Sequence, residues 1–198
     1  MKALGGPTST HVRLATAGDL DDIQRVMRVS MAALAAGFYD PAQTGSAVLH
    51  IAVADRQLID DRTYFVAEVE GRVVACGGWS ARKKLFTGTA SQAAAAGLLD
   101  PETDAARIRA MFVHPELARR GLGRRILEAS ERAAWAAGFR TFELMATLPG
   151  VPLYAACGYQ AVEPTTLELP DGTSLGAVLM RKRAPERGEI IALTDPLP

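Results

Sequence analysis

The chain has 198 residues, of which 48% are hydrophobic, and it carries 22 basic and 22 acidic side chains. This length and composition predict one domain, in which folding buries roughly 70% of the surface that the unfolded chain exposes. Because the charges balance, no overall field attracts nucleic acid or an acidic membrane, so any site for a polyanion must be local.

The cysteines and histidines exclude further classes of protein. Cys76 and Cys157 form no Cys-x-x-Cys pair, which predicts neither a disulfide framework nor a zinc site and fits a reducing compartment. His11, His50 and His114 lack metal-ligand spacing, so no metal is expected. The chain shows no signal peptide and no apolar run near the ~20 residues of a membrane span. We therefore expect a soluble, cytoplasmic protein that binds neither membrane nor nucleic acid.

The first third of the chain predicts a strand followed by helices. Residues 12–15 resemble a short strand, and Thr16 with the acidic residues behind it predicts the start of a helix that extends to Gly37. Met31 lies on the apolar face of this helix and is interpreted as core filler. A second helical region, with poorer periodicity, is expected over residues 42–59.

A β-hairpin is predicted next. Two β-forming runs, residues 63–69 and 72–79, flank Glu70-Gly71, where glycine supplies a positive φ. Cys76 falls in the middle of the second run and is expected to be a buried small residue. Residues 81–106 show no clear element, and a connection of that length is usually functional or mobile.

The central segment predicts a strand, a loop and a helix. Residues 107–113 read as a strand that His114-Pro115 ends. The segment after Leu122 has apolar residues on one helical face, which predicts a helix that starts near Leu122. Gly138 stands where such a helix usually ends. The loop therefore delivers the chain into a helix N-terminus, where four backbone N–H groups lack partners and the peptide dipoles are positive.

This loop has the features of an anion site. Gly121 and Gly123 lack side chains that would hold a ligand away from the amides. The pattern lacks the lysine of a P-loop, and Ile126 stands where a dinucleotide fingerprint needs Gly or Ala. Four arginines surround the opening: Arg119, Arg120, Arg124 and Arg125. The loop therefore suits a polyanion such as a pyrophosphate.

The last third predicts three strands and a short helix. Residues 141–147 alternate in strand fashion, and residues 153–157 form a short helix closed by Gly158. Residues 159–162 and 177–182 are the expected final strands, with Asp171-Gly172 as their turn. The tail after residue 183 contains three prolines around an apolar run.

Two motifs give this chain a resemblance to a known family. Residues 113–124 resemble the acetyl-CoA pyrophosphate loop of the GNAT N-acetyltransferase superfamily, Arg/Gln-x-x-Gly-x-Gly/Ala, although Ala118 occupies its first position. Residues 153–159 resemble the Tyr-x-x-x-Gly-Phe/Tyr segment of the same family, at the usual distance downstream. Two motifs in order and at the right spacing are a specific signal, and the resemblance extends over about residues 12–183.

The resemblance implies the fold and the domain boundaries. It implies an α/β (α+β) protein with the GNAT fold: a mixed, largely antiparallel sheet flanked by helices and splayed at its two central strands. The domain would comprise residues 12–183, between an N-terminal extension of residues 1–11 and a C-terminal tail of residues 184–198.

The resemblance also implies which residues hold acetyl-CoA. The backbone of the central strand would pair with the pantetheine arm, and the loop amides would hold the pyrophosphate. These residues are Met111, Phe112 and Val113 for the arm, and Arg119, Arg120, Gly121, Leu122, Gly123 and Arg124 for the pyrophosphate. Tyr154 is carried over from the family as the general acid near the sulfur, and the first helices would wall the acceptor site.

The implied activity is transfer of the acetyl group of acetyl-CoA to a primary amine of a small molecule or peptide. Because an alkyl amine with a pKa near ~10.4 is protonated at neutral pH, a base is needed, and Glu143 is the candidate, with a water chain as the alternative. A non-catalytic CoA-binding regulatory module remains an alternative function. Residues 81–106 are either a flap or CoA clasp or a solvated loop, and docking of the tail on a second subunit leaves a homodimer open.

Overall fold

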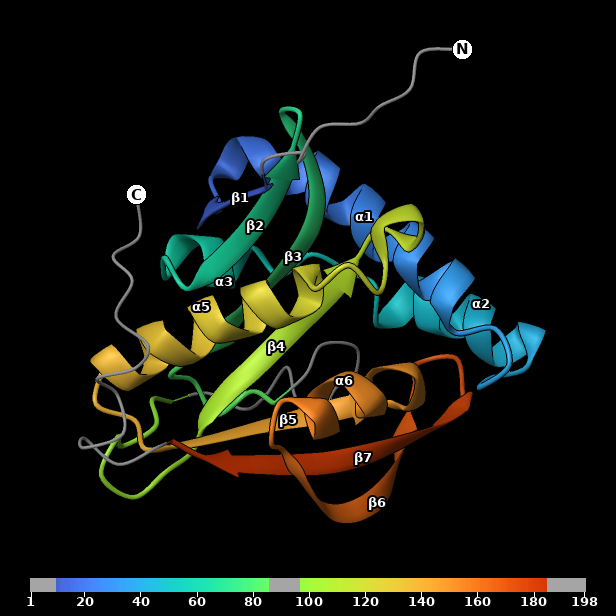
Figure 1. The fold of residues 1–198 in the computed structure, drawn as a ribbon. Coiled ribbons are helices and arrows are strands. Elements are labelled where there is room, and N and C mark those ends of the chain that lie inside the picture. Colours follow the sequence, from blue (N-terminus) through green and yellow to red (C-terminus); the bar gives the residue numbers. More distant parts are fainter. Residues whose placement is uncertain (1–9, 86–96, 185–198) are drawn as a thin grey trace.

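The computed structural model describes residues 10–85 and 97–184. These residues form one seven-stranded sheet in the order β1-β2-β3-β4-β5-β7-β6, flanked by helices (Figure 1). In chain order the elements are β1 (Thr10–Leu14), η1 (Ala17–Asp19), α1 (Leu20–Leu34), α2 (Pro41–His50), α3 (Arg56–Asp60), β2 (Tyr64–Val69), β3 (Arg72–Ser80), β4 (Ala106–Val113), η2 (Pro115–Leu117), α5 (Leu122–Ala136), β5 (Thr141–Thr147), η3 (Leu148–Gly150), α6 (Val151–Ala156), β6 (Gln160–Glu168) and β7 (Ser174–Arg183).

The sheet is antiparallel except between β4 and β5. These two central strands run parallel and pair only at Ala106 with Phe142 and Arg107 with Glu143. Beyond those pairs they diverge, as Figure 1 shows. The mixed, largely antiparallel sheet and the splay expected from the sequence are confirmed.

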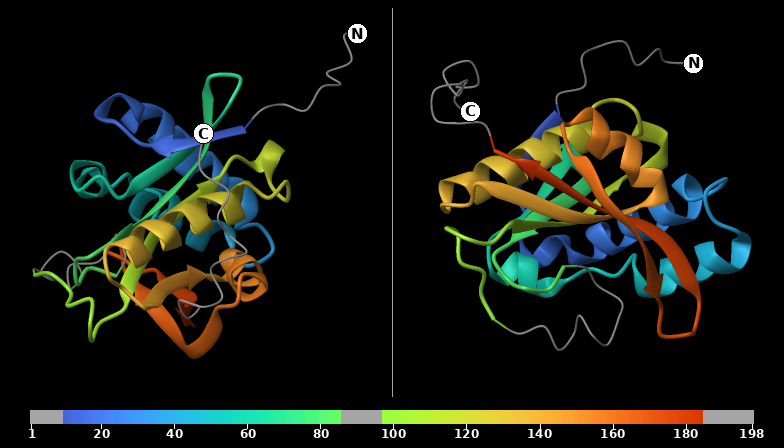
Figure 2. Two further views of the ribbon diagram at one scale, coloured as in Figure 1. Left: turned by 60° about the vertical axis from the view of Figure 1, so that its left-hand side comes forward. Right: turned by 90° about the horizontal axis from the view of Figure 1, so that it is seen from below.

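Helices cover both faces of the sheet. Helix α5 packs on β2, β3 and β4, and α1 packs on β3 and β4 from the opposite side (Figure 2). Each helix turns an apolar face to the sheet, which explains this placement. At most 1% of the surface is exposed for Ile126 and Leu127 of α5 and for Ile23 and Met27 of α1. Hydrophobic core residues therefore cover both faces of the sheet.

The predicted elements before the central strand need one correction. The β2–β3 hairpin forms with Glu70 and Gly71 both at positive φ, so the non-glycine residue shares the strained conformation. The second helical region is two helices, not one. Asp55, in an extended conformation, accepts a hydrogen bond from the amide of Gln57 and so begins α3 as a new helix.

The later elements extend further than the sequence predicts. Strands β6 and β7 pair from Gln160 to Glu168 and are joined by a turn in which Gly172 has a φ of 83°. The expectations for residues 1–9, for residues 86–96 of the 81–106 connection and for the 185–198 tail, including a homodimer through that tail, lie outside the described residues. Within residues 10–85 and 97–184, no helix is long and apolar enough to cross a membrane.

Candidate active site

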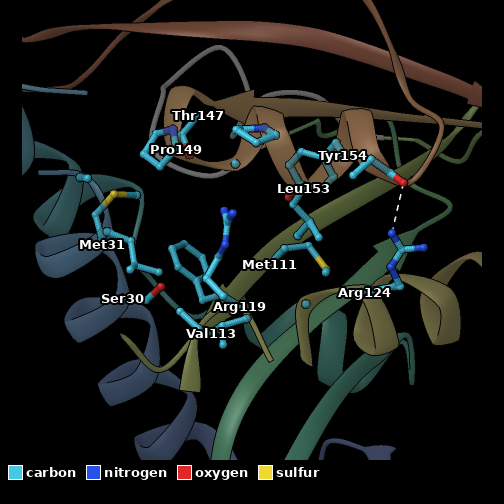
Figure 3. Close-up of a pocket in the computed structure, with 18 of the residues that line it drawn as sticks. Ser30, Met31, Met111, Val113, Arg119, Arg124, Thr147, Pro149, Leu153 and Tyr154 are labelled. Atoms are coloured by element: carbon cyan, nitrogen blue, oxygen red, sulfur yellow. Dashed lines mark hydrogen bonds between the residues drawn. The ribbon is translucent and has the colours of Figure 1, made fainter. Parts of the chain in front are cut away.

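A cavity of about 380 Å³ lies where β4 and β5 have separated. One wall comes from α1 and another from η3 and α6, while β4 and the N-terminus of α5 lie between them (Figure 3). The residues that line it are Ser30, Met31, Leu34, Ala35, Met111, Phe112, Val113, Ala118, Arg119, Gly121, Gly123, Arg124, Thr147, Pro149, Gly150, Pro152, Leu153, Tyr154 and Ala156.

The end of β4 presents backbone groups to this cavity. The N–H of His114 donates to the carbonyl of Val74 on β3. Since backbone groups alternate in direction along a strand, the N–H and C=O of Val113 point away from β3, toward the gap. Strand β5 does not pair there, so this edge is open to an extended ligand.

The loop after β4 is bent by two residues at positive φ. Arg119 has a φ of 65° and Gly121 a φ of 82°. Gly121 is the N-cap of α5 and offers no side-chain cap, so the first amides of the helix have no intrahelical partner. Glycine is the residue suited to this conformation, and bare amides at a helix N-terminus bind anions.

Gly123 lets α5 and α6 approach each other. A Cβ on Gly123 would lie 3.0 Å from Cδ2 of Leu153 and 3.5 Å from Cγ2 of Val113. The sequence motifs containing Gly123 and Leu153 therefore meet in space although 30 positions separate them. Glycine at 123 therefore makes room for α6 beside the start of α5.

The four arginines of the loop separate into two pairs. Arg119 projects into the cavity and Arg124 lines it beside α6, where it donates to the carbonyl of Ala156 at 3.2 Å (Figure 3). Arg120 is exposed outside the lining, and Arg125 donates to the carbonyl of Thr10. Arg119 makes no ion pair or hydrogen bond with any residue in the described ranges. Of these four arginines, only Arg119 and Arg124 can therefore add positive charge inside the pocket.

Leu122 contributes to the site through its backbone alone. Its side chain is 5% exposed and packs in the core with Ile126 and Val74. The same side chain that anchors α5 to the sheet thus sets the position of its own amide at the helix start.

Tyr154 lies on the α6 wall with its side chain largely buried, at 8% exposure. Its ring meets Tyr159 edge-on, with centroids 5.9 Å apart, and a Cβ on Gly150 would come within 3.0 Å of it. The Tyr154 hydroxyl makes no hydrogen bond to a residue in the described part of the chain. Burial raises the pKa of this phenol above its ordinary value, so it keeps its proton and can donate it.

Glu143 does not line the cavity, and the structure argues against its role as the base. One carboxylate oxygen accepts from Arg107 and the other from Arg181, with Nε of Arg181 at 3.0 Å. The side chain is 8% exposed and lies at the paired end of β4 and β5. Because both oxygens are held by cations, we assign Glu143 to a structural ion-pair network instead.

The α1 wall is the part of the site that sequence patterns did not specify by residue. Met31 is 5% exposed and belongs to the core, yet it also lines the cavity with Ser30 and Leu34. Tyr39 ties this region to the opposite wall, because its hydroxyl donates to the carbonyl of Gly176 at 2.6 Å and accepts from the amide of Leu148 at 2.9 Å. Helical periodicity marks Met31 as buried but cannot show that one side faces a cavity.

The two cysteines, which the sequence does not predict to be nucleophiles, do not line the cavity. Cys76 is fully buried, and burial raises the pKa of its thiol to about 12. Cys157 is partly buried, and its pKa is also raised, chiefly by burial, so neither thiol is activated. No cluster of metal-ligating side chains occurs among residues 10–85 and 97–184.

Comparisons with known proteins agree with this arrangement. A family model described as an acetyltransferase (GNAT) domain matches residues 60–161, just over half of the chain. No curated protein matches the sequence.

Several solved structures share the fold. A GCN5-related N-acetyltransferase from Rhodopseudomonas palustris aligns with a TM-score of 0.67 and 21% identity, covering 88% of this chain and 96% of that one. PaiA N-acetyltransferase from Thermoplasma acidophilum, solved in complex with coenzyme A, aligns with a TM-score of 0.59 and 13% identity over 88% and 99%. Ard1 from Thermoplasma volcanium aligns with a TM-score of 0.58 and 15% identity over 89% and 99%.

Proposed function

The chain belongs to the GNAT acetyltransferase family, and from that premise we propose that it transfers the acetyl group of acetyl-CoA to a primary amine. The observation that carries this proposal is the junction of three features at one cavity. The open edge of β4, the bare amides at the start of α5 and the phenol of Tyr154 all border it.

The described residues fit coenzyme A on chemical grounds. The amides from Gly121 to Arg124 and the side chains of Arg119 and Arg124 would hold the pyrophosphate, and the backbone of Met111 and Val113 would pair with the pantetheine arm. Bound acetyl-CoA would supply an activated acetyl group. The protein's contribution is to hold that group beside the amine and exclude alternative orientations.

Proton transfer is assigned to two different agents. Tyr154 would donate a proton to the departing sulfur, since its raised pKa keeps it protonated over the physiological range. An alkyl amine must lose a proton before it attacks. With Glu143 held by Arg107 and Arg181, we propose that water in the open pocket accepts this proton.

The acceptor would enter from the α1 side. This wall combines apolar groups of Met31, Leu34 and Ala35 with the hydroxyl of Ser30. Such a surface suits a small-molecule or peptide amine whose neighbouring atoms are at least partly apolar. The alternative function, a CoA-binding module without turnover, would use the loop and the β4 edge but not the proton donor.

The test measures binding and turnover separately. Calorimetry with coenzyme A should give saturable binding, and a free-thiol assay with acetyl-CoA should show release that an amine stimulates. A panel of alkyl amines, amino acids and peptides identifies the acceptor class. Binding without release by any amine would favour the regulatory module, and absence of CoA binding would contradict both functions.

A further inference from the structure

Strand β4 carries an extra residue immediately before the cavity. Cys76 of β3 pairs with Phe112, and Gly78 pairs with Arg109, so one residue of β3 faces two of β4. Ala110, in this bulge, has a φ of 52°, in the left-handed region that residues with a Cβ seldom adopt. The strand is thus strained where it meets the site.

The bulge changes which backbone groups face the gap. The N–H of Trp79 donates to the carbonyl of Thr63, the residue just before β2, so its neighbour Gly78 directs its backbone toward β4. Its partner Arg109 accordingly directs its own backbone toward β3. In a strand without a bulge, every second residue after Arg109 would also direct its backbone N–H and C=O toward β3.

With the extra residue, this alternation shifts by one. His114, not Val113, donates to β3, through the carbonyl of Val74. Met111 and Val113 therefore direct their N–H and C=O groups to the open edge, where an unbroken strand would have directed them to β3. The register shift is what makes this edge available to a ligand.

One buried side chain holds the bulge in place. The hydroxyl of Tyr64 donates to the carbonyl of Ala110 at 2.8 Å, and Tyr64 is only 2% exposed. Its ring reaches β4 across Gly78, where a Cβ would lie 2.7 Å from Cδ2 of the ring. On the other side of the sheet, a Cβ on Gly77 would lie 2.1 Å from the sulfur of Met111. Both glycines are therefore required by the packing around the bulge.

We propose that Tyr64 is a positioning residue for the acetyl-CoA site: its hydroxyl fixes the Ala110 carbonyl and so keeps the backbone of Met111 and Val113 aligned toward the gap. This inference rests on the proposed function. Tyr64 touches neither reactant and acts through β4. Phenylalanine at this position preserves the ring but leaves the carbonyl of Ala110 without its donor.

The experiment compares Tyr64→Phe with a control that loses a similar buried hydrogen bond elsewhere. Thr63→Val removes the bond from Oγ1 of Thr63 to the carbonyl of Leu58, at 3.2 Å, without touching β4. We expect Tyr64→Phe to weaken CoA binding about tenfold by calorimetry, as loss of one such bond allows. The KM for the amine should stay unchanged, and Thr63→Val should bind CoA like wild type.

A second-site variant tests the mechanism. Glycine takes a positive φ without the cost that a Cβ imposes, so Ala110→Gly should restore most of the CoA affinity of Tyr64→Phe. Three results would each overturn the positioning role. They are wild-type CoA affinity in Tyr64→Phe, a loss of CoA affinity in Thr63→Val equal to that in Tyr64→Phe, and no recovery of CoA affinity in the double variant. Failure of the wild-type protein to bind CoA would instead overturn the proposed function, so the two failures are distinguishable.

Discussion

The two ends of the β4–β5 pair use charged side chains in opposite ways. At the paired end, Glu143 lies buried between Arg107 and Arg181, and its charge is neutralised within the protein. At the splayed end, Arg119 and Arg124 border the cavity and form no ion pair with a described residue. Paired charge at one end therefore links strands to one another, whereas unpaired charge beside bare amides at the other end is available to an anionic ligand.

The largest effect is expected from a variant that breaks the ion pairs of Glu143 at the paired end of β4 and β5. Glu143→Gln should cost about 3 kcal/mol of unfolding free energy, because it leaves the largely buried guanidinium of Arg107 without its counter-charge. Urea denaturation measures this loss, and kcat per folded molecule should stay close to wild type. Arg181→Ala is the milder control, since its half-exposed side chain should contribute about 1 kcal/mol or less. A large fall in kcat with unchanged stability would restore Glu143 as the base.

At the splayed end, the largest effect should come from the proton donor. Tyr154→Phe should lower kcat about a hundredfold, because the thiolate then leaves without a positioned acid. CoA affinity, measured by calorimetry, should not change. Tyr159→Phe is the matched control, since this buried ring contacts Tyr154 but does not line the cavity. Equal kcat in both variants would show that Tyr154 only packs.

The loop conformation can be tested with two glycines of nearly identical geometry. Gly121 has a φ of 82° and Gly172 a φ of 83°, and a Cβ would meet nothing within 4 Å at either position. Valine strains both, so both variants should lose stability. Only Gly121→Val should weaken CoA binding, by about tenfold, since distortion there displaces the amides. Comparable weakening in Gly172→Val would mean that binding follows global stability.

A smaller effect is expected from the arginines. Arg119→Ala should weaken CoA binding about threefold at low salt, because an exposed charge is screened and contributes less than ~1 kcal/mol. Arg120→Ala, from outside the cavity, should have no effect. Titrations at low and high ionic strength measure the difference, and it should shrink as salt rises. Equal loss in both variants would indicate a general field instead of a local contact.

The last prediction concerns pH, where we expect no change in kcat under alkaline conditions. Burial raises the pKa of Tyr154, so the phenol keeps its proton beyond the ordinary tyrosine value of ~10. The kcat, measured at saturating substrates from pH 8 to about 10, should therefore show no fall from loss of the general acid. A fall centred below pH 9 that Tyr154→Phe abolishes would contradict this environment.

Local patterns identified most of the secondary structure for physical reasons that act within a few residues. Ile23 and Met27 repeat at helical spacing, and Gly138 and Gly172 allow the positive φ that ends a helix or turns a hairpin. The break before α3 was missed, because the cap at Asp55 competes with a weakly helical sequence.

The candidate site could be predicted where one short segment carries the chemistry. Gly121 and Gly123 mark the loop that is expected to bind an anion, because the positive φ of Gly121 and the missing side chain of Gly123 act locally. The ion pairs of Glu143 could not be predicted, because its partners, Arg107 and Arg181, lie on two other strands. No periodicity within β5 reveals such partners.

The sequence alone is enough to predict the order of the elements, the turns that need glycine and the glycine-rich loop at the start of α5, since each depends on residues adjacent along the chain. Three features are seen only in the folded protein: the ion pairs of Glu143, the wall that α1 forms at the cavity, and the hydrogen bond from Tyr64 to the carbonyl of Ala110. These features depend on strand register and on the divergence of β4 from β5, which arise from packing between segments distant in the chain.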